Sequence, residues 1–311
     1  MRTLTLALAL AALTVPALAE DAPWYPSKYG ADDTNGAMNN LSPEATVAAA
    51  KLVKTGQVYA LGIVTGPDTP VWPGRSFAVA VMGIDDGGGS PIGETRATGH
   101  DDILMTSVGI GTQLDGFGHM GIDRRHYNGV HARDFYKPDG VTKFGTEAIL
   151  PTATRGVLLD MTRLYKTDQL KPGTAFNRAE IDAAAKAAGV KIRKGDVVLF
   201  HTGWMKMAKT DPKQFISVQP GLGKEGAEYL ASLGVVMIGA DTAALEAIPF
   251  ENPAMPFVVH LTLLTKNGVH VLENINTAEL AKDGATEFLF VLGQPRFQGT
   301  VQAVVNPVAV R

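Results

Sequence analysis

The stretch from Gly109 to His119 gathers the side chains with the clearest potential for chemistry. It carries an amide at Gln113, a carboxylate at Asp115 and an imidazole at His119, interspersed with four glycines. Glycines permit tight turns and let the backbone approach a bound group closely. A mostly hydrophobic run, residues 103–108, comes before the stretch and predicts a strand. The polar side chains therefore follow a strand end, where many functional sites lie.

The residue types in this stretch suit a metal site. Hydrolytic metal centres use imidazole and carboxylate ligands and leave one position open for water. Asp115 and His119 are four residues apart and Gln113 comes two residues earlier, so an irregular turn can bring them together. The alternative is a structural turn in which Asp115 accepts hydrogen bonds from backbone N–H groups. Spacing alone favours that alternative.

Three more candidates lie farther along the chain, each beside an apolar segment. His260 and Glu273 can serve as a proton-transfer or ligand pair, because histidine titrates near neutral pH. The structural alternatives are a half-buried helix histidine bonded to a carbonyl group, and a glutamate in a salt bridge at a strand end. His201 follows a predicted strand and can lie in the site or just behind it.

Aromatic side chains near these positions can form the walls of a site for an aromatic or cyclic substrate. The candidates are Phe117, Trp72 and Trp204. For Trp204 the alternative is a place in the hydrophobic core, and a catalytic role is not expected.

Several catalytic classes are excluded. The chain has no cysteine, which removes thiolate nucleophiles, thiolate metal ligands and disulfides. It has no Gly-x-Ser-x-Gly nucleophile motif and no Gly-x-Gly-x-x-Gly dinucleotide motif between a strand and a helix. The Asp- and Gly-rich residues 85–90 lack the Gly-Lys-Ser/Thr of a phosphate loop and predict a surface turn.

Composition indicates a globular protein with a targeting segment. Of 311 residues 45% are hydrophobic, and the formal net charge is −3, so neither nucleic acid nor an anionic membrane is an expected partner. Arg2, an apolar run over 4–15 and Ala17-Leu18-Ala19 predict a signal peptide at 1–19, too short in its apolar part to remain as a membrane anchor. We expect export to a periplasm, one domain over 20–311, and an N-terminal arm over 20–41.

Alternating elements position these residues. Ser42, Pro43 and Glu44 predict a helix start, with the helix running to about Lys54, and Asn177 with Glu180 forms a capping box for a helix over 178–188. A further helix is expected over 224–233. Strands are expected over 57–63, 77–82, 156–160, 197–200, 235–238, 269–272, 287–292 and 300–305. This order indicates an α/β fold with a mixed sheet.

The sequence around the candidate residues resembles that of the bacterial cyclase family, whose members are also called the kynurenine formamidase-like metal-dependent hydrolases. The family signature His-x-Gly-Thr-His-x-Asp-x-Pro-x-His aligns with residues 109–119. Other ordered matches are Gly36–Glu44, Tyr127–Gly129, Gly195–Val198, His201–Trp204, Gly239–Thr242, His260 with Leu263 and Leu264, Gly268, and Glu273–Asn274. The resemblance implies a swivelling β/α/β, barrel-like mixed sheet surrounded by helices, and a homodimer or homotetramer. It also implies a zinc or manganese ion and hydrolysis of an amide or formamide bond.

Carried over by position, the resemblance assigns Asp115 as a metal ligand and His119 as a ligand or the acid–base. His260 and Glu273 match the distal pair of the site. The sequence departs from the signature where Gly109 and Gln113 replace histidines and Phe117 replaces proline. Gln is a weaker metal ligand than imidazole. Without the two histidines the ligand set is rich in oxygen, and this shifts the expected metal from zinc toward manganese or magnesium.

The resulting hypothesis is an exported metal-dependent hydrolase acting on a C–N bond of a small formamide or cyclic amide. Gln113, Asp115 and His119 would hold the metal, and His119, His260 and Glu273 would move protons. The substrate would contact Phe117, Trp72, His201 and Trp204. One alternative is a metal-free periplasmic binding protein on the same fold, and another is an enzyme with cyclase or lactone chemistry.

Overall fold

A computed structural model describes residues 23–83 and 90–311 of the chain. The expected signal peptide, 1–19, and most of the Gly-rich segment over 85–90 lie outside these described residues. Within the described part no helix combines the length and apolarity that a membrane crossing requires.

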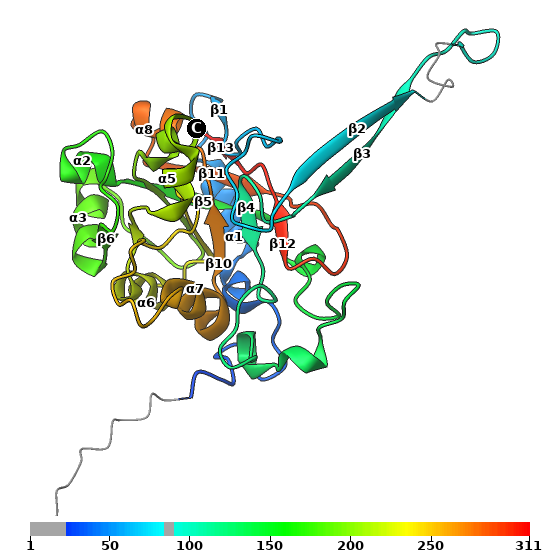
Figure 1. Cartoon of the computed structure of the whole chain (residues 1–311). Helices are drawn as coiled ribbons and strands as arrows, with labels where there is room; N and C mark the ends of the chain where they lie inside the picture. Colours follow the sequence, from blue (N-terminus) through cyan, green and yellow to red (C-terminus); the bar gives the residue numbers. More distant parts are fainter. Residues whose placement is uncertain (1–22, 84–89) are drawn as a thin grey trace, which may run out of the picture.

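A nine-stranded mixed sheet forms the centre of the molecule, and it curls into a half-barrel (Figure 1). Its strand order is β1-β13-β11-β5-β7-β9-β10-β4-β12, in which β5, β7, β9 and β10 run parallel and the remaining pairs run antiparallel. The strands of this sheet are β1 (Val58–Ala60), β4 (Gln113–Asp115), β5 (Thr152–Asp160), β7 (Val197–His201), β9 (Met237–Ala240), β10 (His270–Glu273), β11 (Glu287–Leu292), β12 (Gln302–Val304) and β13 (Val308–Val310).

Helices and short 3-10 turns connect the strands. The helices are α1 (Pro43–Ala50), α2 (Met161–Tyr165), α3 (Arg178–Ala188), α4 (Met207–Thr210), α5 (Pro212–Ser217), α6 (Lys224–Ser232), α7 (Val258–His260) and α8 (Ala278–Lys282), and a π-helix covers Leu261–Asn267. Two short strands, β6 (Ala175–Phe176) and β8 (Gly221–Leu222), pair in parallel apart from the main sheet. The mixed α/β prediction is therefore confirmed.

Side-chain alternation along the strands creates a separate core on each face of the sheet. In β5, Val157 and Leu159 join one buried cluster and Leu158 joins the other, because successive strand residues point to opposite faces. The first cluster includes residues of α3 and α6, such as Ile181 and Leu230, while the second includes Leu280 of α8. The sheet is thus held between two apolar layers.

Local signals at the helix starts behave as predicted, and the helix over 178–188 has its predicted length. Ser42 Oγ accepts a hydrogen bond from the backbone of Ala45 at the start of α1, and the capping box of Asn177 and Glu180 opens α3. The first helix ends at Ala50 instead of continuing to about Lys54, because the chain turns immediately afterwards. The described part of the N-terminal arm packs on its own domain, where Asn128 Nδ2 donates to the backbone carbonyls of Gly30, Ala31 and Asp33.

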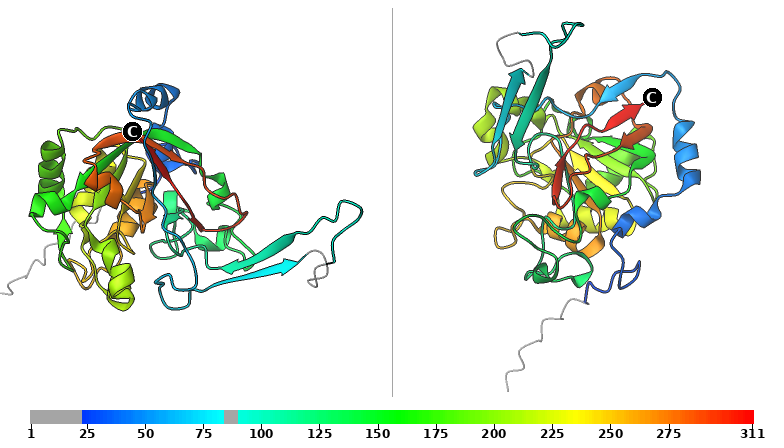
Figure 2. Two further views of the ribbon diagram at one scale, coloured as in Figure 1. Left: turned by 90° about the horizontal axis from the view of Figure 1, so that it is seen from above. Right: turned by 90° about the vertical axis from the view of Figure 1, so that its right-hand side faces the viewer.

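The strand predicted to lead into residues 109–119 has an unexpected position. It is β3 (His100–Thr106), and it pairs only with β2 (Phe77–Gly83), forming a two-stranded hairpin outside the main sheet. Figures 1 and 2 show that this hairpin projects away from the body of the molecule. Its hydrophobic residues therefore do not enter the core, and residues 107–112 carry the chain back to β4.

Candidate active site

Strand register collects four polar side chains on one face of the sheet. In the antiparallel pair β4–β10, Gln113 lies opposite Glu273, and in the pair β4–β12, Asp115 lies opposite Gln302. Directly opposed residues share a face, as do residues two apart along one strand. The side chains consequently meet: Gln113 Nε2 lies 2.6 Å from Glu273 Oε2, and Gln302 Nε2 lies 2.8 Å from Asp115 Oδ1.

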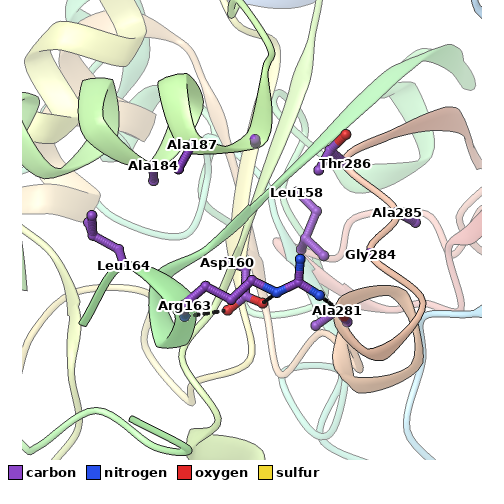
Figure 3. Close-up of a pocket in the computed structure, with 11 residues that line it drawn as sticks. Leu158, Asp160, Arg163, Leu164, Ala184, Ala187, Ala281, Gly284, Ala285 and Thr286 are labelled. Atoms are coloured by element: carbon purple, nitrogen blue, oxygen red, sulfur yellow. Dashed lines mark hydrogen bonds and ion pairs between the residues drawn. The ribbon is translucent and has the colours of Figure 1, made fainter. Parts of the chain in front are cut away.

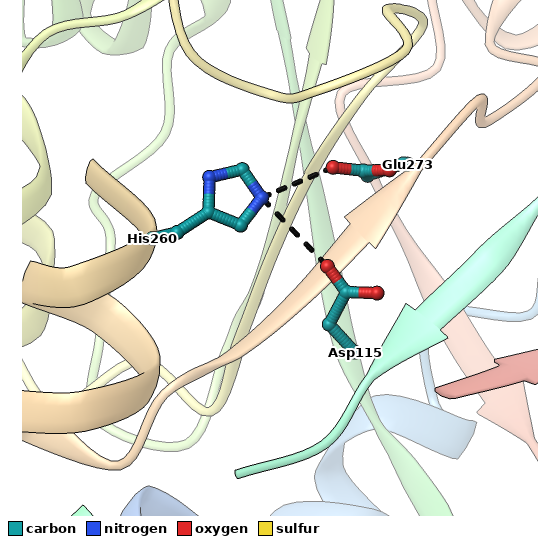
Figure 4. Close-up of side chains that lie close together, drawn as sticks. All are labelled: Asp115, His260 and Glu273. Carbon is teal, nitrogen blue, oxygen red and sulfur yellow. Dashed lines mark hydrogen bonds and ion pairs between the residues drawn. The ribbon is translucent and has the colours of Figure 1, made fainter. Parts of the chain in front are cut away.

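His260 approaches this face from the junction between α7 and the π-helix. Its Nε2 lies 3.1 Å from Glu273 Oε1 and 3.7 Å from Asp115 Oδ2 (Figure 4). One ligand atom from each of these three residues falls within 4.8 Å of the others, and all three residues are buried. π-helical turns often occur at functional sites, where they redirect a side chain. We call Asp115, His260 and Glu273 the triad.

The triad has the ligand atoms of a cation site and a buried carboxylate oxygen without a hydrogen-bond partner. Asp115 Oδ2 is buried and has no hydrogen-bond partner, which is costly for a carboxylate oxygen. It faces the same point as His260 Nε2 and Glu273 Oε1 (Figure 4). One imidazole and two carboxylates make up the three-ligand arrangement that leaves a coordination position open in catalytic metal sites. The residues therefore fit a single divalent cation.

Glu246 orients His260. Its Oε1 accepts hydrogen bonds from the backbone N and from Nδ1 of His260, at 3.2 and 2.6 Å. Because Nδ1 donates to Glu246, Nε2 is directed at the two triad carboxylates, as in the carboxylate–histidine–metal arrangements that fix a ligand's tautomer. Glu246 is 2% exposed, so it forms part of a buried network.

The pKa values reflect the excess of buried negative charge. Burial alone would lower the pKa of His260, but the hydrogen bonds that its ring donates to Glu246 and Glu273 outweigh it and hold this pKa well above its ordinary value. Burial, followed by the nearby charge of Asp115, raises the pKa of Glu273 to about 7. Three carboxylates thus surround one imidazole, an environment that favours an additional positive charge.

Hydrogen-bonding side chains fill the space at the two positions where the signature has histidine, 109 and 113. A Cβ atom at Gly109 would lie 2.8 Å from both Cδ and Nε2 of Gln302 and closer still to its Oε1. Gln302 therefore occupies the space into which a larger residue 109 would project. Arg75 Nη1 donates to the carbonyl of Gly109 and lies 3.4 Å from Gln113 Oε1.

Gln113 does not have the orientation expected of a metal ligand. Arg75 can only donate hydrogen bonds, so the amide oxygen of Gln113 faces Arg75 and its nitrogen faces Glu273. The nitrogen also lies 3.4 Å from Asp115 Oδ1. In this arrangement Gln113 holds the two carboxylates in place, and its oxygen points away from them.

His119 lies beside the triad without joining it. It is half-buried in the turn after β4, and its backbone N donates to the carbonyl of Gly116 at 3.0 Å. Burial lowers the pKa of His119, and the charge of Asp115 only partly reverses this shift. His119 is therefore a neutral imidazole at pH 7, able to accept a proton, and the structure does not group it with the metal-binding atoms.

The structure places the predicted substrate-binding residues mostly outside the site. Phe117 is 3% exposed and stacks on His270 with ring centroids 4.3 Å apart, so it is a core residue. Trp204 is 1% exposed, and its Nε1 donates to the carbonyl of Phe215. Trp204 is enclosed in the core, whereas Phe117 and His270 line a cavity of about 160 Å³. The assignment of the Phe117 and Trp204 rings as substrate walls stays a prediction.

The other two candidates differ from each other. His201 Nδ1 lies 2.8 Å from Thr277 Oγ1 and 3.3 Å from Asp241 Oδ2, in a separate network at the end of β7. Trp72 is partly buried, and its Nε1 lies 3.4 Å from the carbonyl of Ala243. Trp72 precedes Arg75 by three residues and stays a candidate for substrate contact.

Sequence reasoning missed Arg75, Glu246 and Gln302. Each contacts a site residue only through the tertiary fold, at sequence separations of 34, 14 and 187 residues. No local motif marks them, although an unassigned acidic residue shortly before His260 is the kind of signal that points to a histidine-orienting carboxylate.

A cavity elsewhere in the molecule lacks comparable chemistry. It has a volume of about 340 Å³ and lies among residues of β5, α2, α3 and α8 (Figure 3). The charged residues in its lining, Asp160 and Arg163, pair with each other at 3.0 Å. The triad is therefore the stronger candidate for an active site.

Comparison with known proteins identifies the family of this chain. A family model described as "Putative cyclase" matches residues 20–247. The chain is a member of the cyclase family. No curated protein matches the sequence. Family membership confirms the resemblance on which the sequence interpretation rested.

Solved structures support the same fold. The crystal structure of a novel cyclase superposes with a TM-score of 0.81 at 30% identity, covering 91% of this chain and 98% of that one. An isatin hydrolase bound to the product analogue thioisatinate gives a TM-score of 0.60 at 20% identity, covering 86% and 98%. Isatin hydrolase A from Labrenzia aggregata gives 0.58 at 15% identity, covering 84% and 94%. The cyclase-like half-barrel predicted from the resemblance is thus confirmed.

Proposed function

We propose that this cyclase-family protein is a metal-dependent hydrolase that cleaves the C–N bond of a small cyclic amide or formamide. The observation that carries the proposal is the convergence of Asp115 Oδ2, His260 Nε2 and Glu273 Oε1 on one buried point, with Asp115 Oδ2 lacking any other partner. The cyclic amide class is supported by the fold shared with isatin hydrolases, since isatin contains a ring amide.

Asp115, His260 and Glu273 would hold the cation, and oxygen-rich ligation favours manganese over zinc. When bound, a divalent cation polarises a substrate carbonyl and makes a water molecule more acidic. Glu246 keeps His260 Nε2 directed into the site, and the Gln113 and Gln302 amides restrain the carboxylates. These contacts preorganise the ligands, which limits the rearrangement needed on binding.

His119 is the residue proposed to transfer the proton. Its lowered pKa keeps the imidazole neutral at pH 7, so it can accept a proton from the attacking water. The same imidazole, once protonated, can deliver that proton to the leaving nitrogen, which must be protonated before the C–N bond breaks. Arg75 lies on the other side of Gln113, where its positive charge balances part of the negative charge of the triad.

The test is turnover of an N-formyl aromatic amine and of isatin by metal-stripped protein supplied with Mn²⁺ or Zn²⁺. We expect hydrolysis that requires the ion. His119→Asn should lower kcat by roughly 10² to 10⁴, the usual contribution of a general base. His131→Asn serves as a matched control, because His131 makes none of the contacts described for the triad and its Nδ1 accepts a hydrogen bond from the backbone N of Arg133. Absence of turnover with both substrates and both ions contradicts the amide-hydrolase proposal.

One observation favours a second candidate, a metal-free periplasmic binding protein. Arg75, Gln113 and Gln302 fill the region of the two missing signature histidines with a guanidinium and two amides. This network already supplies donors to both triad carboxylates. Ligand binding that is unaffected by chelators, with no turnover, would support this candidate. Product analysis separates hydrolysis from the third alternative, cyclase or lactone chemistry.

Export is proposed on the sequence alone, from the pattern of residues 1–19. Fractionation of a bacterium expressing the full chain should recover the protein in the periplasm with its N-terminus at residue 20. Recovery of the protein in the cytoplasm with residues 1–19 still attached would contradict the proposal.

A further inference from the structure

A cavity beside His270, which we call the His270 cavity, lies apart from the triad. It has a volume of about 160 Å³, and most of its lining is apolar, including Met38, Phe117, Phe144 and Ile149. None of the three triad residues is part of this lining. The proposed hydrolysis uses neither the cavity nor its buried histidine, so both need a separate explanation.

Strand register places His270 on the face of the sheet opposite to the triad. Val271 pairs with Asp115, and residues 271 and 273 of β10 share one face, so the side chain of His270 leaves the strand on the other face. Its ring meets the neighbouring strand only through the backbone, because Nδ1 donates to the carbonyl of Asp115 at 2.9 Å. The cavity is therefore separate from the metal-binding atoms, although it adjoins the strand that carries one of them.

The second ring nitrogen of His270 is an open hydrogen-bond acceptor. A carbonyl oxygen only accepts, so the ring proton lies on Nδ1. Burial without a bonded carboxylate disfavours the charged ring, so Nε2 keeps its lone pair. Residues 23–83 and 90–311 give Nε2 no hydrogen-bond partner, yet it is not one of the unpartnered polar atoms that the protein covers completely. His270 is only 2% exposed, and it lines the cavity, so a molecule in the cavity can reach Nε2.

Flat rings make up part of the cavity wall. Phe117 stacks on His270 with an angle of 4° between the ring planes, and Phe144 meets Phe117 edge to face with centroids 6.1 Å apart. Such rings offer faces and edges to another aromatic ring. An apolar cavity of about 150 Å³ is large enough to bind benzene. The size and the walls of the His270 cavity therefore suit a single six-membered ring.

One ammonium group lies at the opening of the cavity. Ala148 and Leu150 are exposed members of the lining and so border this opening. Among the described residues the lining includes Lys143 and no acidic side chain. Lys143 Nζ lies 5.4 Å from the centroid of the Phe144 ring, which holds it beside the aromatic wall. It takes part in no ion pair within the described part of the chain, so it is available to an anionic group.

We infer that the His270 cavity binds a single-ring aromatic amine that carries a carboxylate. The ring fills the apolar space, an N–H group donates to His270 Nε2, and the carboxylate stays near Lys143 at the opening. Thr34 and Asn35 add oxygen acceptors to the lining, which favours an amine with two N–H groups over a phenol with one O–H. Hydrolysis of a ring amide fused to benzene leaves an amine and a carboxylate on one molecule, so the class includes products of the proposed reaction. Only this last link rests on the proposed function.

The first experiment titrates 3-aminobenzoate into the protein by calorimetry, with benzoate and aniline as ligands that each lack one group. We expect one site per chain with a Kd on the order of 0.1–1 mM, which ligand efficiency allows for about ten heavy atoms. Benzoate should bind about 3- to 10-fold more weakly because it cannot donate to Nε2, and aniline about 2- to 5-fold more weakly because it lacks the anion. Asp115→Asn should leave the Kd unchanged, whether or not the protein is a hydrolase. No saturable binding below about 10 mM, or binding that Asp115→Asn abolishes, overturns the inference.

The second experiment locates the ligand with variants whose folding is checked by urea unfolding. Ala148→Phe places a ring across the opening and should abolish binding, and the variant should fold because Ala148 is exposed. Ala179→Phe is the matched control, since Ala179 is an exposed alanine of α3 outside the lining, and it should bind normally. His270→Phe keeps a flat ring beside Phe117 but removes the acceptor, so it should bind 3-aminobenzoate no better than benzoate. Lys143→Gln should bind 3-aminobenzoate no better than aniline. Unchanged affinity in Ala148→Phe or in His270→Phe overturns the inference.

Discussion

The packing of Gln302 against Gly109 predicts a double-mutant cycle in which two substitutions are strongly coupled. Gly109 does not have a positive φ, so its backbone accepts alanine, and only space opposes the new methyl group. That group would fall 2.8 Å from Cδ and Nε2 of Gln302. Gln302 is 7% exposed and donates to Asp115 Oδ1 at 2.8 Å, so moving it breaks a buried hydrogen bond to a carboxylate.

The magnitude follows from that bond. Hydrogen bonds to charged groups contribute about 1.5–3 kcal/mol, whereas Gly→Ala at a compatible backbone position stabilises by about 0.4–1 kcal/mol through the unfolded chain. Gly109→Ala should therefore lower the free energy of unfolding by about 1–2.5 kcal/mol, and Gln302→Ala by about 1.5–3 kcal/mol. Once Gln302 is truncated the methyl group at 109 has room, so the double variant should be no less stable than Gln302→Ala.

The assay is urea unfolding of the wild type, both single variants and the double variant. The expected coupling is about 1.5–3 kcal/mol in favour of the double variant. Gly66→Ala is the control, because a Cβ there meets nothing within 4 Å, and its effect should stay within about 0.5 kcal/mol. Additive losses from the two substitutions would refute the argument that Gln302 fills the space beside residue 109.

Three further outcomes follow from the described contacts. Glu246→Gln keeps an acceptor for His260 but removes the charge, so calorimetry should show metal affinity falling about 10- to 100-fold; an unchanged affinity contradicts the orienting role. Burial opposes charge on His201, but Asp241 outweighs it and raises the pKa of His201. The stabilisation from this pair is therefore complete below the unfolded-state pKa and is lost as pH rises through the raised folded-state pKa. His201→Asn should cost about 1.5–3 kcal/mol at pH 6 and distinctly less at pH 9 in urea unfolding; an equal cost at both pH values would exclude that pairing. Phe117→Ala should cost about 3–5 kcal/mol of unfolding free energy because Phe117 is a core residue, and a change in KM without loss of stability would return it to the substrate site.

The sequence predicts much of the helix and strand order because capping residues and apolar runs are local signals. Ser42 and the pair Asn177 and Glu180 begin helices where their hydrogen-bonding chemistry indicates. The position of the β2–β3 hairpin could not be predicted from such local signals. An apolar run such as residues 103–108 predicts a strand but does not specify which surface covers it, and in this fold the strand pairs outside the main sheet.

The site shows the same division between local and long-range information. Asp115, His260 and Glu273 were candidates by residue type, yet each retained a structural alternative until strand register brought residues 113 and 273 together. Gln113 as a ligand stays a prediction, because the orientation of its amide depends on Arg75, which no local pattern links to it. Aromatic residues such as Phe117 are equally suited to cores and to substrate sites, so residue type could not decide between these roles.

The central claim, that the triad holds one divalent cation, is tested most directly by calorimetric titration of Mn²⁺ into metal-stripped protein, alongside Asp115→Asn and the control His201→Asn. Asn at 115 is nearly isosteric but replaces one carboxylate oxygen with an amide nitrogen that cannot bind a cation. The account predicts one ion per chain for the wild type and for His201→Asn, and loss of binding for Asp115→Asn. No binding by the wild type, or equal binding by Asp115→Asn, would contradict it.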